Sequence, residues 1–205
     1  MDKVYTNFLS RKGKENTLSC KISTLKKLLP FEEIDIDLNI NITEIDREHI
    51  FISNTESKGF LVEKPSKSPK YDFCSLYKKI ITSIGCIKEL YNFNNEYFEN
   101  IAELFTYDDE SIGIGEWNND FEKKILKSKL NPNIKPDELY TFAYEANGNR
   151  YLMSKAGNVF LYANDPNYRN IEVLDNCPKY TFYKFMDLSS INDLVKLFIN
   201  DFISE

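Results

Sequence analysis

The stretch that decides the fold is YTFAYEANGNRYLMSKAGNVFLYAND, residues 140–165. Three runs rich in aromatic and aliphatic residues are separated by the short turns NGN and KAGN. Glycine and asparagine adopt the positive φ angles that tight hairpin turns need, and Phe, Tyr and Val favour strands. The stretch therefore predicts three antiparallel strands, at 139–145, 150–154 and 158–163.

Patterns on either side extend this block. Two further strands are predicted at 171–174 and 180–186, and a helix at 190–203 begins at Ser189 or Ser190 and buries a stripe of apolar residues. Earlier in the chain, IDIDLNINI alternates apolar and polar residues over 34–42 and predicts a half-buried strand. HIFIS and GFLVE predict strands at 49–53 and 59–63.

Apolar residues at helical spacing predict four more helices. The ranges are 17–29, 76–91, 96–105 and 117–130. Helices combined with a run of strands joined by tight turns predict an α+β fold, in which helices flank a central antiparallel sheet.

The best candidate for a domain boundary is KPSKSPK, residues 64–70, which is polar and contains two prolines. We expect an N-terminal segment, 1–69, with one helix and several strands, and an α+β domain over 70–205. A linker this short leaves it open whether the two are separate or parts of one fold.

Composition favours a folded protein of the cytoplasm. Aromatic residues make up 14% of the 205 residues, and neither a secretory signal nor an apolar stretch of membrane-spanning length is present. The four cysteines form no close pair, so we expect buried free thiols rather than a zinc site or a redox pair.

Charge is distributed unevenly. The net charge is −6, and residues 91–122 contain nine acidic residues and no basic one. An acidic chain binds nucleic acid poorly, because phosphate affinity needs clustered Lys or Arg, and is better suited to a basic partner.

The candidate residues for such a surface lie in this acidic segment. Glu96, Glu99 and Glu103 share one face of the predicted helix 96–105, and the next segment supplies a loop and two aromatic rings. The predicted partner-binding set is Glu96, Glu99, Glu103, Tyr107, Asp108, Asp109, Glu110, Glu116 and Trp117. Trp117 also begins the apolar stripe of the helix 117–130, so it is either an interface anchor or part of the core.

The sequence shows few of the residue patterns that are typical of an enzyme active site. The single histidine, His49, lies beside a predicted strand with no nucleophile motif around it, so a Ser-His-Asp or Cys-His site is not expected. Asp108, Asp109, Glu110 and Glu116 can supply oxygen ligands to a divalent ion, but they lack the spacing that wraps one ion. A binding protein without metal or cofactor is predicted, with a metal-dependent hydrolase using these acids as the rival.

The central block also resembles a known family. FAYEANGNRYLMSKAGNVFLYANDP, followed by CPKYTFYKF and a terminal amphipathic helix, is similar to the SUKH superfamily, the Syd-like and yeast cell-wall-regulator-like proteins. The family pattern is matched at Gly148, Asn149, Gly157, Val159, Phe160 and Asp165. The resemblance covers about residues 112–205; LLP at 28–30 fits the family, but the NGG that usually follows is absent.

This resemblance implies a function. Many bacterial SUKH proteins are immunity proteins of polymorphic toxin systems, so we expect this chain to bind and neutralise a cognate toxin, and a basic nuclease domain would suit its acidic segment. The family also implies an alternative, an intracellular adaptor without a toxin partner.

Overall fold

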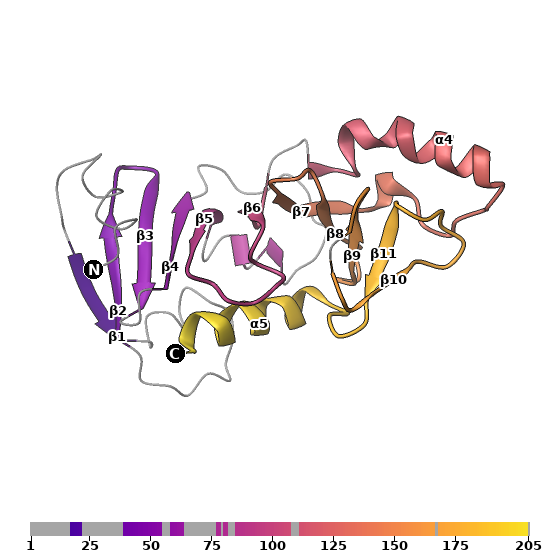
Figure 1. Ribbon diagram of the computed structural model, residues 1–205. Helices are drawn as coiled ribbons and strands as arrows, with labels where there is room; N and C mark the ends of the chain where they lie inside the picture. Colours follow the sequence, from indigo (N-terminus) through magenta and orange to yellow (C-terminus); the bar gives the residue numbers. More distant parts are fainter. Residues whose placement is uncertain are drawn as a thin grey trace.

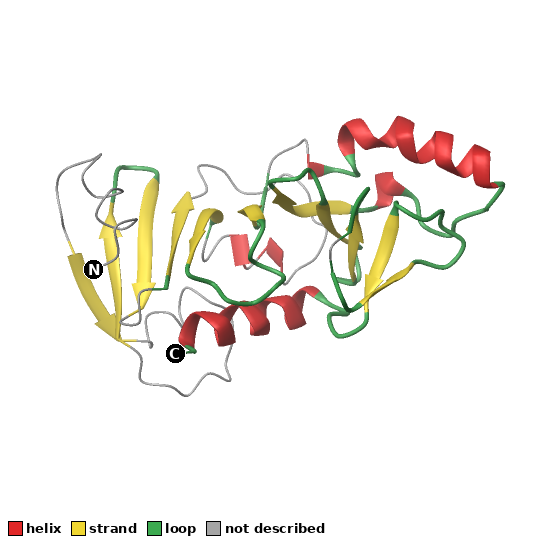
Figure 2. Ribbon diagram, in the orientation of Figure 1, coloured by secondary structure: helices red, strands yellow, loops and turns green. Residues whose placement is uncertain are grey.

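A computed structural model of the protein describes residues 17–21, 39–54, 58–63, 77–78, 80–81, 85–107, 111–166 and 168–204. Within these residues the fold is α+β and is dominated by one antiparallel sheet (Figures 1 and 2). Its 11 strands follow the order β1-β2-β3-β4-β5-β6-β7-β8-β9-β11-β10. Nearly every strand therefore pairs with its neighbour in sequence, as expected when short turns join the strands.

The strands begin and end as follows: β1 Thr17–Lys21, β2 Asn39–Glu44, β3 His49–Asn54, β4 Gly59–Glu63, β5 Cys86–Tyr91, β6 Ile101–Leu104, β7 Tyr140–Glu145, β8 Arg150–Met153, β9 Val159–Tyr162, β10 Ile171–Val173 and β11 Phe182–Phe185. Among the described residues, α4 Asn118–Ser128 and α5 Ile191–Ile203 are α-helices, η2 Gly115–Trp117 and η3 Pro136–Glu138 are short 3-10 helices, and residues 77–78 and 80–81 are also helical.

The sequence predictions are confirmed from residue 117 onward. The predicted strands at 139–145, 150–154, 158–163, 171–174 and 180–186 correspond to β7–β11, and the predicted helices at 117–130 and 190–203 correspond to α4 and α5. The turns need their glycines, because Gly148 has φ +90° and Gly157 has φ +84°. The predicted strands at 49–53 and 59–63 are β3 and β4, and the strand at 34–42 is confirmed over 39–42, as part of β2.

Three predicted helices are wrong in part or in whole where the structure describes them: 76–91 is helical at 77–78 and 80–81 but not beyond Gly85. Residues 17–21 form β1, residues 86–91 form β5, and 96–105 consists of a turn followed by β6. Gly85 explains one error: its φ is +99°, and a Cβ there would lie 2.3 Å from the Glu63 carbonyl oxygen. The chain turns at this glycine and pairs with β4 instead of continuing as a helix.

The other corrections have a common cause. A short strand can bury one face and carry long side chains on the other. Its apolar spacing is then hard to distinguish from that of a short helix. Pairing with β5 and β7 then decides the conformation of β6. The remainder of the predicted helix 17–29, the segment 34–38 and the candidate boundary 64–70 lie outside the described residues, and the division at 69/70 stays a prediction.

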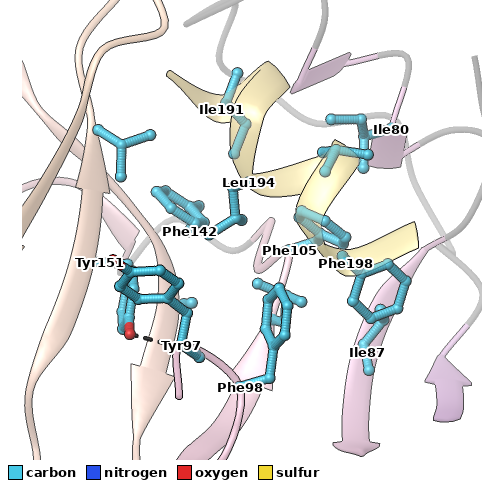
Figure 3. Packing of buried hydrophobic residues seen from close by; sticks show 14 of the residues in the cluster. Ile80, Ile87, Tyr97, Phe98, Phe105, Phe142, Tyr151, Ile191, Leu194 and Phe198 are labelled. Carbon is cyan, nitrogen blue, oxygen red and sulfur yellow. Dashed lines mark hydrogen bonds between the residues drawn. The ribbon is translucent and has the colours of Figure 1, made fainter. Parts of the chain in front are cut away.

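The sheet has a core on each side. The larger core lies between the sheet and α5, and Figure 3 shows Leu194 and Phe198 of α5 among side chains from the strands and the loops between them. The smaller core lies under α4 and includes Phe121, Leu152 and Phe182. Alternate residues of β8 serve the two cores, since Tyr151 and Met153 belong to the first and Leu152 to the second.

Helix α5 lies along the sheet and is held at both ends (Figure 1). At its start, Ser190 and Asp193 form a reciprocal capping box, and the backbone N–H of Ile191 donates to the Gly157 carbonyl at 2.9 Å. Toward its end, Phe198 and Phe202 pack edge-on against Phe60 of β4, with ring centroids 5.3 and 5.2 Å away. The helix therefore connects the β8–β9 turn to the distant strand β4.

A buried ion pair holds the end of α5. Lys58 Nζ donates to the Asp201 carbonyl at 2.7 Å, to Asp201 Oδ1 at 3.0 Å and to Ser204 Oγ at 2.8 Å. The Asp201 carboxylate also accepts from the backbone N–H groups of Asn94 and Asn95. These contacts satisfy both buried charges and place a cation at the negative end of the helix dipole.

Replacing Lys58 by Met should therefore destabilise the protein strongly. The substitution leaves the Asp201 carboxylate buried without its counterion, which costs about 3–5 kcal/mol when one partner of such a pair is removed. Urea unfolding measures the loss. Lys196→Met removes an exposed lysine of α5 and should change stability by no more than about 0.5 kcal/mol. Equal losses in the two variants would contradict the role given to the pair.

Candidate partner-binding surface

An open groove of about 510 Å³ lies at the β7–β8 turn. Three segments line it: the loop before β6, the turn itself and the loop after β9. The lining residues are Glu96, Glu99, Asn100, Glu145, Asn147, Asn149, Pro166, Tyr168 and Arg169. These described lining residues include three carboxylates and one guanidinium, so acidic groups predominate in the groove.

Backbone hydrogen bonds position the turn against the loop before β6. The N–H of Ala146 donates to the Asn100 carbonyl at 3.0 Å, and the N–H of Glu145 donates to the Asn149 carbonyl at 3.0 Å. The Asn147 side chain accepts from the backbone N–H of Asn149 at 3.0 Å, an arrangement that favours a tight turn. The turn that contains Gly148 and Asn149 therefore forms one wall of the groove.

Glu145 is the buried carboxylate of the groove, with 5% of its surface exposed. It accepts hydrogen bonds from Asn149 Nδ2, at 2.9 Å, and from the Tyr168 hydroxyl. Burial raises the pKa of Glu145 above its ordinary value of 4.5, and the hydrogen bond from Asn149 opposes this rise. A fixed, poorly solvated carboxylate is suited to contact a cationic group that enters the groove.

Tyrosine side chains of the larger core pack next to the groove. The Tyr151 hydroxyl donates to the Tyr168 hydroxyl, 2.8 Å away, and the rings of Tyr97 and Tyr168 stack with centroids 6.0 Å apart. The Tyr97 hydroxyl donates to Asp187, and burial followed by this carboxylate raises the pKa of Tyr97. Burial also raises the pKa of Tyr151, so the hydroxyls of Tyr97 and Tyr151 remain protonated donors at neutral pH.

Two of the predicted partner-binding residues lie in this groove. Glu96 is half-buried and Glu99 is exposed, and both belong to a turn, so the predicted helical face is wrong. Glu103 lies elsewhere, on β6, where it accepts from Lys88 and from the Cys86 thiol at 3.0 Å. Lys88 therefore gives one acid of the segment 91–122 a countercharge that the segment itself lacks.

Tyr107 is also separate from the groove. Its hydroxyl donates to Glu63 at 3.3 Å, and Glu63 in turn pairs with Lys88 at 2.9 Å. Burial, followed by the charge of Glu63, raises the pKa of Tyr107 to about 12. Asp108, Asp109 and Glu110 lie outside the described residues.

Trp117 and Glu116 lie on the other side of the same turn. A Cβ on Gly148 would sit 3.7 Å from Cζ2 of Trp117, and Glu116 is exposed beside it. Trp117 is half-buried and packs against the smaller core under α4. The indole therefore contributes to the core, and its role as an interface anchor stays a prediction.

Sequence reasoning missed Glu145, Asn149 and Tyr168 as site residues. Glu145 ends a strand in which aromatic residues dominate, and an acidic residue at a strand end resembles an ordinary solvent-facing one. The one available signal was its position directly before the turn ANGN, because side chains that flank a tight turn lie close together.

His49 and the four cysteines are the other candidates from the sequence. His49 Nδ1 lies 2.9 Å from Asp46 Oδ1, beside the β2–β3 turn. Cys86 and Cys177 are free and buried, as predicted, and burial raises the pKa of the Cys177 thiol to about 11. The side chains of Cys20 and Cys74 are not among those described.

The described residues contain neither a metal-binding cluster nor a membrane-spanning helix. No three or more His, Cys, Asp or Glu side chains there are arranged to hold a metal ion. No helix in that part of the chain has the length and apolar character needed to cross a membrane.

Comparisons with known proteins leave the family open: no family model, no curated protein and no solved structure matches the chain.

The raised pKa of Glu145 gives the protein a specific pH dependence. Because the folded-state pKa exceeds the unfolded value of 4.5, the folded state binds this proton more tightly. The contribution of Glu145 to stability is therefore largest at acid pH and falls as pH rises through the window that begins near 4.5. Relative to Glu145→Gln, the wild type should lose stability as pH increases from 4 to 7, a range of about three units.

Chemical unfolding at several pH values measures this difference. Glu99→Gln removes an exposed carboxylate from the same groove and controls for the change in net charge. A wild-type advantage over Glu145→Gln that grows with pH would show that the carboxylate is stabilised in its charged form, contrary to this expectation.

Proposed function

We propose that the protein is a non-enzymatic bacterial immunity protein of the SUKH type, which acts in the cytoplasm by binding and neutralising a cognate toxin. The observation that carries the proposal is the acidic groove on the β7–β8 turn. This turn contains Gly148 and Asn149, two residues of the pattern that resembles the family. Binding residues are often carried on loops and turns that a rigid scaffold positions, as this turn is by the sheet.

The chemistry of the groove favours a basic partner. Glu96 and Glu99 lie at its rim, Glu145 is buried in it, and Arg169 is the one cation among its described lining residues. Nuclease domains carry basic clefts that bind phosphates, and carboxylates at matching positions can occupy such a cleft. We therefore propose a basic toxin domain, of nuclease type, as the partner.

The groove also explains how a cationic side chain would be recognised. Glu145 is held in place by Asn149 and Tyr168, so it loses little freedom when it meets a partner. A lysine or arginine that reaches it would form a charge-assisted hydrogen bond at a poorly solvated position, while Glu96 and Glu99 attract it over a longer range. The rim would then set the association rate and the buried carboxylate the lifetime of the complex.

Reversing the rim charges tests the proposal. The variant Glu96→Lys with Glu99→Lys should associate with the toxin domain encoded beside this gene about tenfold more slowly, with a weaker dependence on salt. Stopped-flow or surface-based association kinetics at several ionic strengths measure both quantities. The matched control is Glu48→Lys with Asp175→Lys, which makes the same change of charge at exposed positions outside the groove lining.

An unchanged rate and salt dependence in a folded rim variant would place the interface elsewhere. If the neighbouring genes encode no toxin domain, the adaptor function becomes the better hypothesis. The same charge-reversal pair would then be applied to whichever protein partner binds the chain.

A further inference from the structure

The smaller core is covered less completely than the larger one. Helix α4 buries Phe121 alone among its residues, whereas α5 buries seven of its residues. Ile134 and Phe160 pack against the smaller core, yet both remain half-buried. Part of the apolar surface on the α4 side of the sheet is therefore accessible to a ligand.

A pocket of about 460 Å³ opens at this incompletely covered edge of the core. Its apolar lining consists of Ile134, Leu139, Ala156 and Phe160. Leu139 directly precedes β7, and Ala156 belongs to the turn that follows β8, whereas the acidic groove lies at the turn between β7 and β8. The pocket and the acidic groove are therefore at opposite ends of the β7–β8 hairpin.

Two exposed lysines, Lys135 and Lys155, form the rim of this pocket, which we call the lysine-rimmed pocket. Glu138 also lines it and lies 3.2 Å from Lys135, but the side chains of this pair are 67% and 74% exposed, so solvent weakens their attraction. Lys155 has no carboxylate partner in the described part of the chain. The rim therefore has an excess of positive charge.

The segment that leads into the pocket is also basic. Residues 123–135 contain five lysines and no acidic residue. Lys124 pairs with Asp120 at 2.7 Å, and three further lysines of the segment are exposed: Lys123, Lys127 and Lys129. Leu126, in the same segment, is 78% exposed. This side of the molecule therefore presents positive charge together with apolar surface, unlike the acidic groove.

The chemistry of the pocket favours a ligand that is apolar and anionic at once. The floor gains free energy when an apolar group displaces water from it, and the rim attracts negative charge beside that group. Nucleic acid fits less well, because the chain has a net charge of −6 and Phe160 is the one aromatic ring among the described lining residues. Proteins that bind single strands present several rings on which successive bases stack.

We propose that the lysine-rimmed pocket binds a peptide segment of a partner protein in which an apolar residue is flanked by acidic residues. The apolar side chain enters between Ile134 and Phe160, and the flanking carboxylates lie beside Lys135 and Lys155. An apolar anchor in a pocket with a polar rim is a common arrangement in protein interfaces. This inference goes beyond the proposed function, because it concerns another cavity and a partner segment of the opposite charge.

Amide chemical shifts of the full-length chain, titrated with short peptides, test the site. The probe is the capped peptide Glu-Asp-Phe-Asp-Glu, and two comparison peptides replace its Phe by Ala or its four acidic residues by Lys. The probe should shift the amides of Lys155 and Ala156 saturably, with a Kd on the order of 1 mM. The Ala peptide should bind about tenfold more weakly, because it lacks the side chain that fills the floor.

Three outcomes of this titration would overturn the proposal. The first is the absence of a saturable shift at the lining residues with the probe. The second is equal binding of the probe and either comparison peptide, because the site would then not recognise an apolar group beside negative charge. The third is tighter binding of decathymidylate than of the probe at the same residues, which would assign the pocket to nucleic acid.

Charge reversal of the rim separates local recognition from attraction by net charge. Lys135→Glu with Lys155→Glu should weaken binding of the probe about tenfold or more. The matched control is Arg47→Glu with Lys196→Glu, which makes the same change of charge at exposed positions outside the pocket lining and should retain most of the binding. An equal loss in the two variants would overturn the proposal.

A variant that fills the pocket provides an independent test. Ala156→Phe changes no charge, and because Ala156 is exposed on a turn, the substitution leaves both cores intact. Binding of the probe should fall about tenfold, since the new ring occupies the place of the anchor. The amide spectrum without peptide shows that the variant is folded, and undiminished binding in this folded variant would contradict the proposed position of the anchor.

Discussion

The structure depends on the fixation of α5 across the sheet. An open antiparallel sheet of 11 strands is stable only if its apolar face is covered, and α5 covers the larger core. The helix begins at a capping box beside the β8–β9 turn and ends at the buried pair of Lys58 and Asp201 near the β3–β4 turn. Strands that are far apart in the sheet are therefore held in one arrangement by contacts with the same helix.

The candidate sites follow from this arrangement. The acidic groove lies at the β7–β8 turn, and Trp117 packs against the other side of this turn. Glu145 and its tyrosine partners face the α5 side, whereas Arg150 and Trp117 face the α4 side. Because neighbouring residues in a strand point to opposite faces, the β7–β8 hairpin contributes side chains to both faces of the sheet.

Sequence reasoning succeeded where local signals agree and failed where they conflict. From 139 to 163, alternation, glycine turns and strand-forming residues all indicate the same hairpins. Between 86 and 105 the apolar spacing indicates helices, but Gly85 and pairing with β4 and β7 produce strands β5 and β6. The same failure affected the site, because the helical face proposed for Glu96, Glu99 and Glu103 depended on that spacing. The count of acidic residues still led to Glu96 and Glu99, which line the groove.

The sequence by itself determined the elements whose causes are local: the hairpins of β7–β9, the capped helix α5, and the acidic character of the segment that supplies the groove rim. Only the tertiary structure decided which charges are neighbours. Lys58 reaches Asp201 across 143 positions of the chain, Lys88 joins Glu63 to Glu103, and the loop after β9 brings Tyr168 to Glu145. The physical reason is that electrostatic and hydrogen-bond partners are chosen by proximity in space, and proximity between distant segments is set by strand pairing and core packing, which no local pattern encodes.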